Sequence, residues 1–194
     1  RPLGRRRHLE LGLADLGLKA LDRHWVRGGL PLSFLARSEE DSLAWRREFL
    51  RTYTERDLPQ LGAALPPVAL RRFLTMVAHY HGNIWKSADP ARSLAVSEPT
   101  VARYLDLLAG VYLVRLLQPW HENLMKRQVK APKVYFRDSG LVHALLGIRT
   151  RDELLGHPKC GASWEGYVVE EVLNLAEPDE AYFWATHNGA ELDL

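Results

Sequence analysis

The sequence is poor in the features that mark secreted and membrane proteins. It holds one cysteine, Cys160, so a disulfide within the chain is impossible, and such low cysteine use is typical of a reducing cytosol. No apolar run approaches the roughly 20 residues that a membrane helix needs; the run over 107–114 is bounded by Asp106 and Arg115. The first residues also lack the apolar core of a signal peptide. We therefore expect a cytoplasmic protein without a membrane partner.

Positive charge is missing from the last part of the chain. Lys159 is the last basic residue, and residues 160–194 contain eight of the 24 acidic residues. Residues 1–159 therefore carry 26 basic and 16 acidic groups, a net charge of +10. This surplus favours contact with a polyanion, whereas the last part repels one unless it holds cations. The simpler alternative is two solvated faces of opposite sign.

Helical periodicity dominates the first part of the chain. Residues 39–61 predict an amphipathic helix, in which Trp45, Phe49 and Tyr53 form one stripe and charged residues the other faces. Glycine and proline punctuate residues 22–35, which predicts a loop before that helix.

The middle of the chain predicts three helices followed by strands. The third helix begins at the Ser97 cap and carries an apolar stripe of Val101, Tyr104, Leu105 and Leu108. The expected elements are helices over 69–82, 89–96 and 97–111, strands over 112–120 and 133–136, and a helix over 139–147. This order is that of a winged helix-turn-helix, a DNA-binding motif.

The last block predicts a helix and a hairpin. The helix begins at the Ser163 cap, and residues 181–186 then alternate as a strand does. The Asn-Gly pair at 188–189 is a strong signal for a two-residue turn, after which residues 190–194 begin a second strand. A helix followed by antiparallel strands is how a small α/β domain begins.

Several stretches of this sequence together resemble one large prokaryotic family. They are WVRGGLP, FLRTYTERDL, SEPTVARYLDLLAGVYLV, NLMKRQVKAPKVYFRDSGL, HP, WEGYVVEEV and GAELDL, in this order. Members of the family that they resemble pair an N-terminal AAA-type P-loop ATPase with a C-terminal domain of unknown function. The resemblance implies that this chain is the C-terminal portion of such a protein.

The chain carries no phosphate-binding loop of its own. In the nearest match, residues 156–163, Ala162 stands where the loop needs lysine. We therefore assign no cofactor-binding residues here, and the resemblance places ATP and its Mg²⁺ in the missing ATPase domain. The absence of an initiator methionine also predicts a chain cut from something longer. The expected partners are its own ATPase domain, DNA and a second copy of the chain.

The expected fold class is α+β, in three parts. A mostly helical region over 1–65 follows the missing ATPase, and a winged-helix domain with a basic segment covers 66–147. Residues 148–194 resemble the start of a truncated restriction-endonuclease-like α/β domain.

The resemblance to PD-(D/E)xK nucleases implies an incomplete metal site. In that superfamily a helix Glu and a strand Asp hold Mg²⁺, and the Lys of a following Glu-x-Lys strand helps to activate water. Glu165 matches the helix acid and Asp193 the strand acid, so these two are the candidate catalytic and metal-binding residues. The Glu-x-Lys strand would lie past Leu194, which makes catalysis by this chain alone unexpected.

The residues themselves leave alternatives for both acids. On the predicted helix Glu165 shares a face with apolar residues, so its carboxylate needs a cation or hydrogen-bond donors, whether from a metal site or from the exposed N–H groups of the first turn. Asp193 lies two residues from Glu191, so on a strand both point to one face, which suits Mg²⁺ or a solvated, charged edge equally.

Two surfaces are candidates for nucleic-acid contact. Thr100 and Arg103 lie opposite the apolar stripe of the third helix, but the surface around them is thin for reading bases. The stretch from 126 to 137 is more basic and contains no acid. Its candidate phosphate-binding residues are Lys126, Arg127, Lys130 and Lys133. The alternative is that this stretch faces the acidic last block.

Three functions remain open from the sequence. The first is a non-catalytic accessory region of an AAA-type ATPase that contacts nucleic acid. The second is an Mg²⁺-dependent nuclease in the untruncated protein. The third is a protein-interaction or oligomerisation platform for the ATPase.

Overall fold

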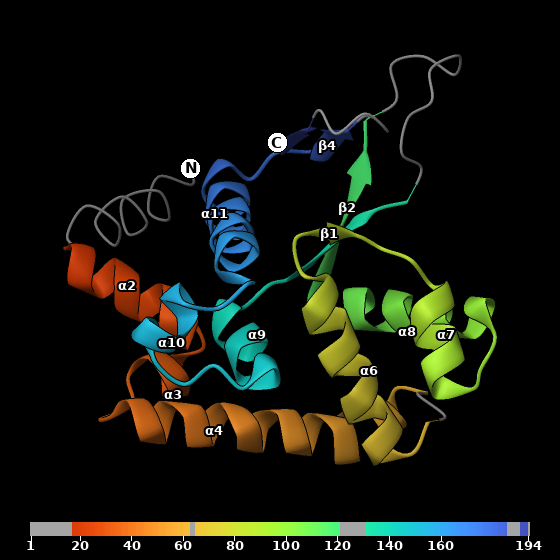
Figure 1. Cartoon of the computed structure of the whole chain (residues 1–194), viewed down its shortest axis with the longest axis horizontal. Helices are drawn as coiled ribbons and strands as arrows, with labels where there is room; N and C mark the ends of the chain where they lie inside the picture. Colours follow the sequence, from red (N-terminus) through yellow and green to blue (C-terminus); the bar gives the residue numbers. More distant parts are fainter. Residues whose placement is uncertain (1–16, 63–64, 121–130, 186–190, 194) are drawn as a thin grey trace, which may run out of the picture.

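The computed structural model describes residues 17–62, 65–120, 131–185 and 191–193, and its mixture of helices with one sheet confirms the α+β class (Figure 1). The first part is helical, and its elements run in the following order. They are α2 (Leu18–Arg27), α3 (Pro31–Phe34), α4 (Glu39–Thr52), a π-helical turn η1 (Tyr53–Asp57) and α5 (Leu58–Gln60). The loop expected over 22–35 is therefore wrong over 22–27, where α2 continues, and over 31–34, where α3 lies.

Helix α4 begins at Ser38, whose hydroxyl accepts a hydrogen bond from the Asp41 N–H at 3.0 Å. Its expected apolar stripe is only half-buried. The three rings of that stripe, Trp45, Phe49 and Tyr53, stack in sequence along the helix. The face turned to the core carries Leu43, Arg46 and Leu50 instead.

The middle of the chain has the helices and strands that the sequence predicts, with one strand added. The elements are α6 (Pro67–Tyr80), β1 (Asn83–Ile84), α7 (Ala88–Leu94), α8 (Glu98–Gly110), β2 (Val114–Pro119), β3 (Lys133–Phe136) and α9 (Ser139–Leu146). Ser97 caps α8 by accepting from the Thr100 N–H, as predicted. All four residues of the predicted α8 stripe are buried, so that prediction is confirmed.

The last block contains α10 (Arg151–Leu155), α11 (Cys160–Ala176), β4 (Tyr182–Ala185) and β5 (Glu191–Asp193). Helix α11 begins three residues before the predicted start. Ser163 is therefore not its cap but a buried residue inside the helix, and Lys159 occupies the N-cap position without a side-chain hydrogen bond.

One sheet of five strands, in the order β1-β3-β2-β4-β5, joins the middle of the chain to its last block. Strand β3 pairs antiparallel with both β1 and β2, while β2 pairs parallel with β4. The predicted β4–β5 hairpin is present, and its turn lies outside the described residues. Ala185 pairs with Glu191, whereas an uninterrupted two-residue turn at 188–189 would pair it with Leu192.

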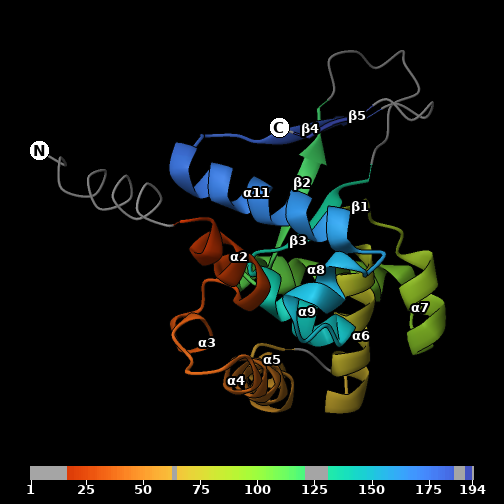
Figure 2. The same cartoon turned by 60° about the vertical axis from the view of Figure 1, so that its left-hand side comes forward.

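Helix α11 lies across the sheet (Figure 2). Val169 and Leu173 of this helix pack with Leu117, Tyr135 and Phe183 of three different strands in one buried cluster. A larger cluster forms around α6 and α8, and it includes Leu50 and Leu58 from the first part of the chain. The α11 cluster therefore ties the acidic last block to the strands of the middle of the chain.

Buried polar contacts connect α2 with distant elements. Trp25 Nε1 donates to the Ser163 hydroxyl at 2.9 Å, and that hydroxyl lies 2.7 Å from His143 Nε2. Asp138 accepts from the N–H groups of Gly29 at 2.9 Å and Leu30 at 3.2 Å. The contacts of Trp25, Gly29 and Leu30 join residues more than 100 positions apart and fix the first helices against α9 and α11.

Among the described helices, none is both long enough and apolar enough to cross a lipid bilayer.

Candidate functional site

The outward face of α8 matches the predicted reading surface. Arg103 is exposed and its guanidinium carbon lies 5.8 Å from the centroid of the Tyr104 ring. Thr100 is half-buried, and its hydroxyl lies 2.9 Å from that of Ser97. Glu98 and Asp106 are also exposed on this helix, so its exposed charges are one cation and two anions. Such a surface suits contact with a backbone better than base readout.

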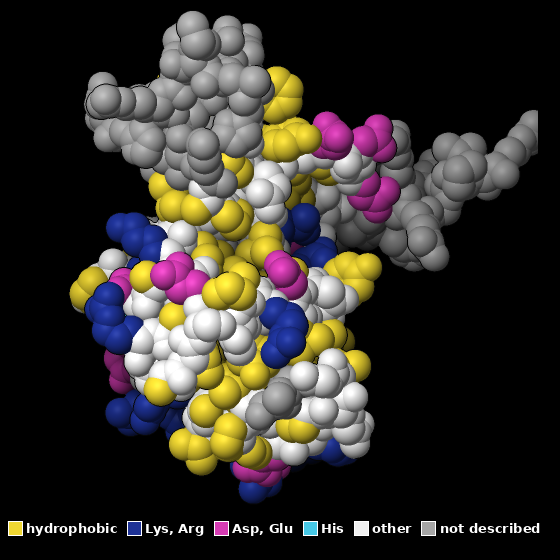
Figure 3. Space-filling model, turned by 90° about the vertical axis from the view of Figure 1, so that its right-hand side faces the viewer, with side chains coloured by type: hydrophobic (Ala, Val, Ile, Leu, Met, Phe, Trp, Pro, Cys, Tyr) yellow, Lys and Arg dark blue, Asp and Glu magenta, His cyan; other side chains and the backbone are white. Residues whose placement is uncertain are grey.

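The basic stretch divides into two groups. Lys126, Arg127 and Lys130 lie outside the described residues. Lys133 and Arg137 are described, and both pair with carboxylates of α11. The face seen in Figure 3 has scattered Lys and Arg side chains among hydrophobic and uncharged ones. Contact of this stretch with phosphates would therefore depend on Lys126, Arg127 and Lys130.

Lys133 is held inside the protein. Its side chain is 4% exposed, and its ammonium group lies 3.2 Å from Glu165 Oε1 and 5.7 Å from the centroid of the Phe183 ring. The Tyr135 hydroxyl donates to the same Glu165 oxygen at 2.6 Å. Glu165 thus has the cation and the donor that its position on α11 requires, and both come from β3.

The structure also places the second candidate acid in this region. Strand β5 pairs Asp193 with Phe183, the residue whose ring lies near the Lys133 ammonium group. Within the described parts of the chain, no group of three or more His, Cys, Asp or Glu residues could hold a metal ion. The described residues alone therefore do not form a complete carboxylate site for Mg²⁺.

A serine and a histidine meet in the core without forming a reactive site. Ser163 and His143 are each 1% exposed, so a substrate has no access to the hydroxyl. His143 Nδ1 lies 2.9 Å from the Val26 carbonyl oxygen, which fixes the proton on this nitrogen, and burial lowers the pKa of this imidazole to about 4. The pair therefore acts as a structural link between α9, α11 and α2.

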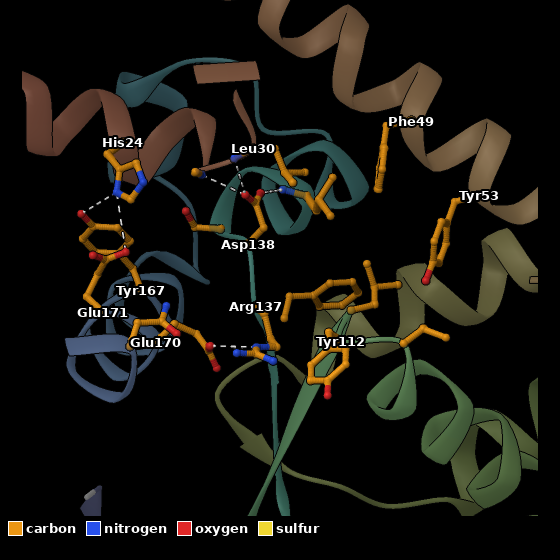
Figure 4. Close-up of a pocket in the computed structure, with 18 residues that line it drawn as sticks. His24, Leu30, Phe49, Tyr53, Tyr112, Arg137, Asp138, Tyr167, Glu170 and Glu171 are labelled. Atoms are coloured by element: carbon orange, nitrogen blue, oxygen red, sulfur yellow. Dashed lines mark hydrogen bonds and ion pairs between the residues drawn. The ribbon is translucent and has the colours of Figure 1, made fainter. Parts of the chain in front are cut away.

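A cavity of about 450 Å³ opens where the three parts of the chain meet (Figure 4). One wall is aromatic and comes from Phe49 and Tyr53, with Tyr112 beside them. The opposite wall is polar, and α2 and α11 supply it. Its labelled residues in Figure 4 are His24, Tyr167, Glu170 and Glu171, and Arg137 and Asp138 lie between the walls. The volume of the cavity, and its lining by both apolar and polar side chains, are typical of a ligand-binding pocket.

Two of the acidic groups in this cavity are fully engaged. Glu170 accepts from Arg115 Nε at 2.5 Å, from Arg115 Nη2 at 3.1 Å and from Arg137 Nε at 3.2 Å. Asp138 accepts from three backbone N–H groups, one of them that of Leu141 at the start of α9. Burial raises the pKa of the Asp138 carboxyl, and these N–H donors oppose the rise.

Glu171 is much less engaged than its neighbours. Its nearest partner is His24, whose Nδ1 lies 3.7 Å from Glu171 Oε1 and also 3.0 Å from the Tyr167 hydroxyl. Burial raises the pKa of the Glu171 carboxyl; the interaction with His24 opposes this rise, and the charge of Glu170 adds to it. Burial and Glu171 together also raise the pKa of Tyr167, to about 12.

Unusual backbone marks both tyrosines of the aromatic wall. Tyr53 opens the π-helical turn that follows α4, and such turns often occur at functional sites. Tyr112 has a φ of 59°, a left-handed conformation that is rare for a bulky residue, and its side chain is 75% exposed. Its ring packs against Arg137, whose guanidinium carbon lies 5.3 Å from the ring centroid.

Sequence reasoning missed this cavity as a site. Its residues come from α2, α4, the turn between α8 and β2, the turn between β3 and α9, and α11, so no local motif brings them together. One signal did point here, because the basic stretch and the acidic last block were expected as an alternative to face each other. The pairs Arg137–Glu170 and Lys133–Glu165 are contacts of that kind.

Comparison with protein families gives a match over residues 18–152, to a family described as a domain of unknown function, DUF8612. The chain belongs to the DUF8612 family. The matched DUF8612 region reaches from α2 to the start of α10 and includes Arg137 and Asp138, but not α11.

Two curated relatives carry no functional description. They are the uncharacterized proteins Mb2031c of Mycobacterium bovis and Rv2008c of Mycobacterium tuberculosis, each 52% identical to this chain over 184 residues. The match covers 95% of this DUF8612 chain but 42% of each relative, so the chain spans less than half of their length. No solved structure matches the chain.

Proposed function

We propose that this chain is an accessory region of a longer AAA-type ATPase and that it contacts nucleic acid through a winged helix. One observation carries the proposal: the elements α6, β1, α7, α8, β2 and β3 follow one another with β3 paired between β1 and β2. This order and pairing support the proposed winged helix-turn-helix, a motif in which the third helix and the loop between the last two strands approach the duplex.

Charge supports the same role for the connection between β2 and β3. This connection holds Lys126, Arg127 and Lys130, and it belongs to residues 1–159, which carry the surplus of positive charge. The outward face of α8 adds Arg103. Cations of this kind neutralise phosphates and release counterions, which gives affinity without sequence preference.

The link to an ATPase rests on the family resemblance of the sequence and on the length of the relatives. The chain covers 42% of each curated relative, which leaves room for a further domain in the whole protein. The ATPase domain would supply the ATP and Mg²⁺ chemistry, and this chain would supply the contact with the nucleic acid.

Fluorescence anisotropy of a labelled DNA duplex at several salt concentrations tests the proposal. We expect binding at low salt and a steep loss as salt rises. In a Lys126→Glu, Arg127→Glu, Lys130→Glu variant, affinity should fall at least about tenfold, and the slope of log K against log salt should shrink by about 3 if each cation meets one phosphate.

A charge-matched control separates a local contact from the overall charge. Lys19→Glu, Arg37→Glu and Arg47→Glu change the net charge equally, at exposed positions in the first helical part. This control should retain the affinity within about threefold, because distant exposed charges are screened. Equal loss in both variants, or no low-salt binding by the native chain, would overturn the nucleic-acid function.

A second function, an Mg²⁺-dependent nuclease in the longer protein, is favoured by one observation. Glu165, Lys133 and the backbone of Asp193 are assembled around β3, β4 and β5. A supercoiled plasmid incubated with the full-length protein and Mg²⁺ tests it. Nicking that is lost in both Glu165→Gln and Asp193→Asn would support this function, and nicking unaffected by either change would exclude these residues.

A further inference from the structure

One carboxylate in the cavity between α4 and α11, that of Glu171, has weaker contacts with positive groups than its neighbours. Among the described residues, Glu170 has two arginines and Asp138 has three N–H donors, whereas the contact of Glu171 is the long one to His24. A half-buried carboxylate without a close cation is held in an unfavourable environment when ionised. A cation placed beside Glu171 would stabilise the ionised form of this carboxylate.

The other wall of the cavity complements such a cation. Phe49 and Tyr53 stack with their ring centroids 5.6 Å apart and an angle of 18° between the ring planes. Both rings line the cavity, so they offer a flat apolar surface to whatever occupies it. Aromatic faces attract cations and pack against flat apolar groups, and both interactions become stronger when water is excluded.

We infer that this cavity binds a cationic ligand, an ammonium or guanidinium group carried on a flat or apolar body. The charged end lies toward Glu171, and the body lies against Phe49 and Tyr53. The same chemistry is offered by a free amine and by an arginine side chain of a protein segment. This site is separate from α8 and the β2–β3 connection, so it does not depend on the proposed nucleic-acid function.

Three matched compounds test the charge that the cavity selects. Phenethylammonium, 2-phenylethanol and phenylacetate share a ring and a short chain but carry positive, zero and negative charge. Each is titrated into isotope-labelled protein while amide chemical shifts are recorded. We expect saturable shifts around Tyr53, Tyr112 and Glu171 with the cation, and much smaller ones with the other two.

Variants test which groups bind the cation. Glu171→Gln should weaken phenethylammonium binding by roughly threefold to fivefold, the size expected for a partly exposed charge pair. Phe49→Leu should weaken the cation and the neutral compound together, because both use the ring wall. Glu40→Gln removes an exposed carboxylate that does not line the cavity and should leave all three titrations unchanged.

The outcomes separate the possible occupants. Stronger binding of acetyl-Gly-Arg-Gly-amide than of phenethylammonium identifies a protein side chain as the source, and the reverse identifies a free amine. Preferential binding of phenylacetate would overturn the inference, since two guanidinium groups share Glu170 and an anion would then be the occupant. Absence of shifts with every compound, in protein whose melting temperature is unchanged, would also overturn it.

Discussion

Replacing Glu170 by glutamine should loosen the attachment of the acidic last block to the sheet. The Glu170 side chain is 5% exposed and accepts three hydrogen bonds from Arg115 and Arg137, which are 25% and 29% exposed. Removing one partner of a buried ion pair costs about 3–5 kcal/mol. The arginines can partly rehydrate and the amide still accepts one bond, so we expect a loss of about 2 kcal/mol in the free energy of unfolding.

Urea unfolding followed by circular dichroism measures this loss, and a thermal melt should show a fall of about 4–8 °C for a chain of this length. Glu171→Gln is the matched control on the same helix. Because burial already disfavours the charged form of Glu171, its replacement should change the free energy of unfolding by less than about 0.5 kcal/mol. Equal effects of the two variants, or no effect of Glu170→Gln, would refute the assigned role of the Arg115–Glu170–Arg137 contacts.

Two further predictions concern the core. Burial lowers the pKa of His143 to about 4 and that of His81 to about 3, so near pH 6.5 only the unfolded chain takes up protons at these residues. The free energy of unfolding should therefore fall as the pH drops from 7 to 5.5. In urea titrations, His143→Gln should flatten this pH dependence. Gly140→Ala should cost more than about 3 kcal/mol in the same assay, because the added Cβ would lie 2.1 Å from the Arg27 carbonyl oxygen, while Gly161→Ala, which meets nothing within 4 Å, should stabilise α11 by about 0.5 kcal/mol.

The sequence predicts those helices and strands whose signals come from residues close together in the chain. The α8 stripe of Val101, Tyr104, Leu105 and Leu108 has helical spacing, and Ser97 stands where a cap must stand, so both could be read directly. The β4–β5 pairing was also predicted. Its register was not, because the residues between the strands decide how the pairing starts and a single residue changes every partner.

Long-range contacts explain what the sequence did not reveal. Arg46 looks like part of a charged helix face, yet its side chain is wholly buried, and its Nη1 donates to the carbonyls of Val26 at 3.2 Å and Gly140 at 2.8 Å. Nothing near position 46 indicates these acceptors, which are 20 and 94 residues away. Burial lowers the pKa of Arg46 to about 10, although the charges of Asp138 and Glu39 oppose this shift.

The candidate sites were predictable in type but not in detail. The sequence indicated that Glu165 needed a cation or donors, and it left metal and protein partners open. The structure supplies Lys133 and Tyr135, 32 and 30 residues earlier in the chain. It also leaves Glu171, a residue that no motif distinguishes from its neighbour Glu170, as the carboxylate with the weakest contacts in the cavity.

The contacts of α2 have a consequence for the order in which the protein is made. Trp25 reaches its hydrogen-bond partner only when Ser163 exists, and Gly29 and Leu30 reach theirs only when Asp138 exists. During synthesis these particular contacts therefore cannot form until more than a hundred further residues have left the ribosome.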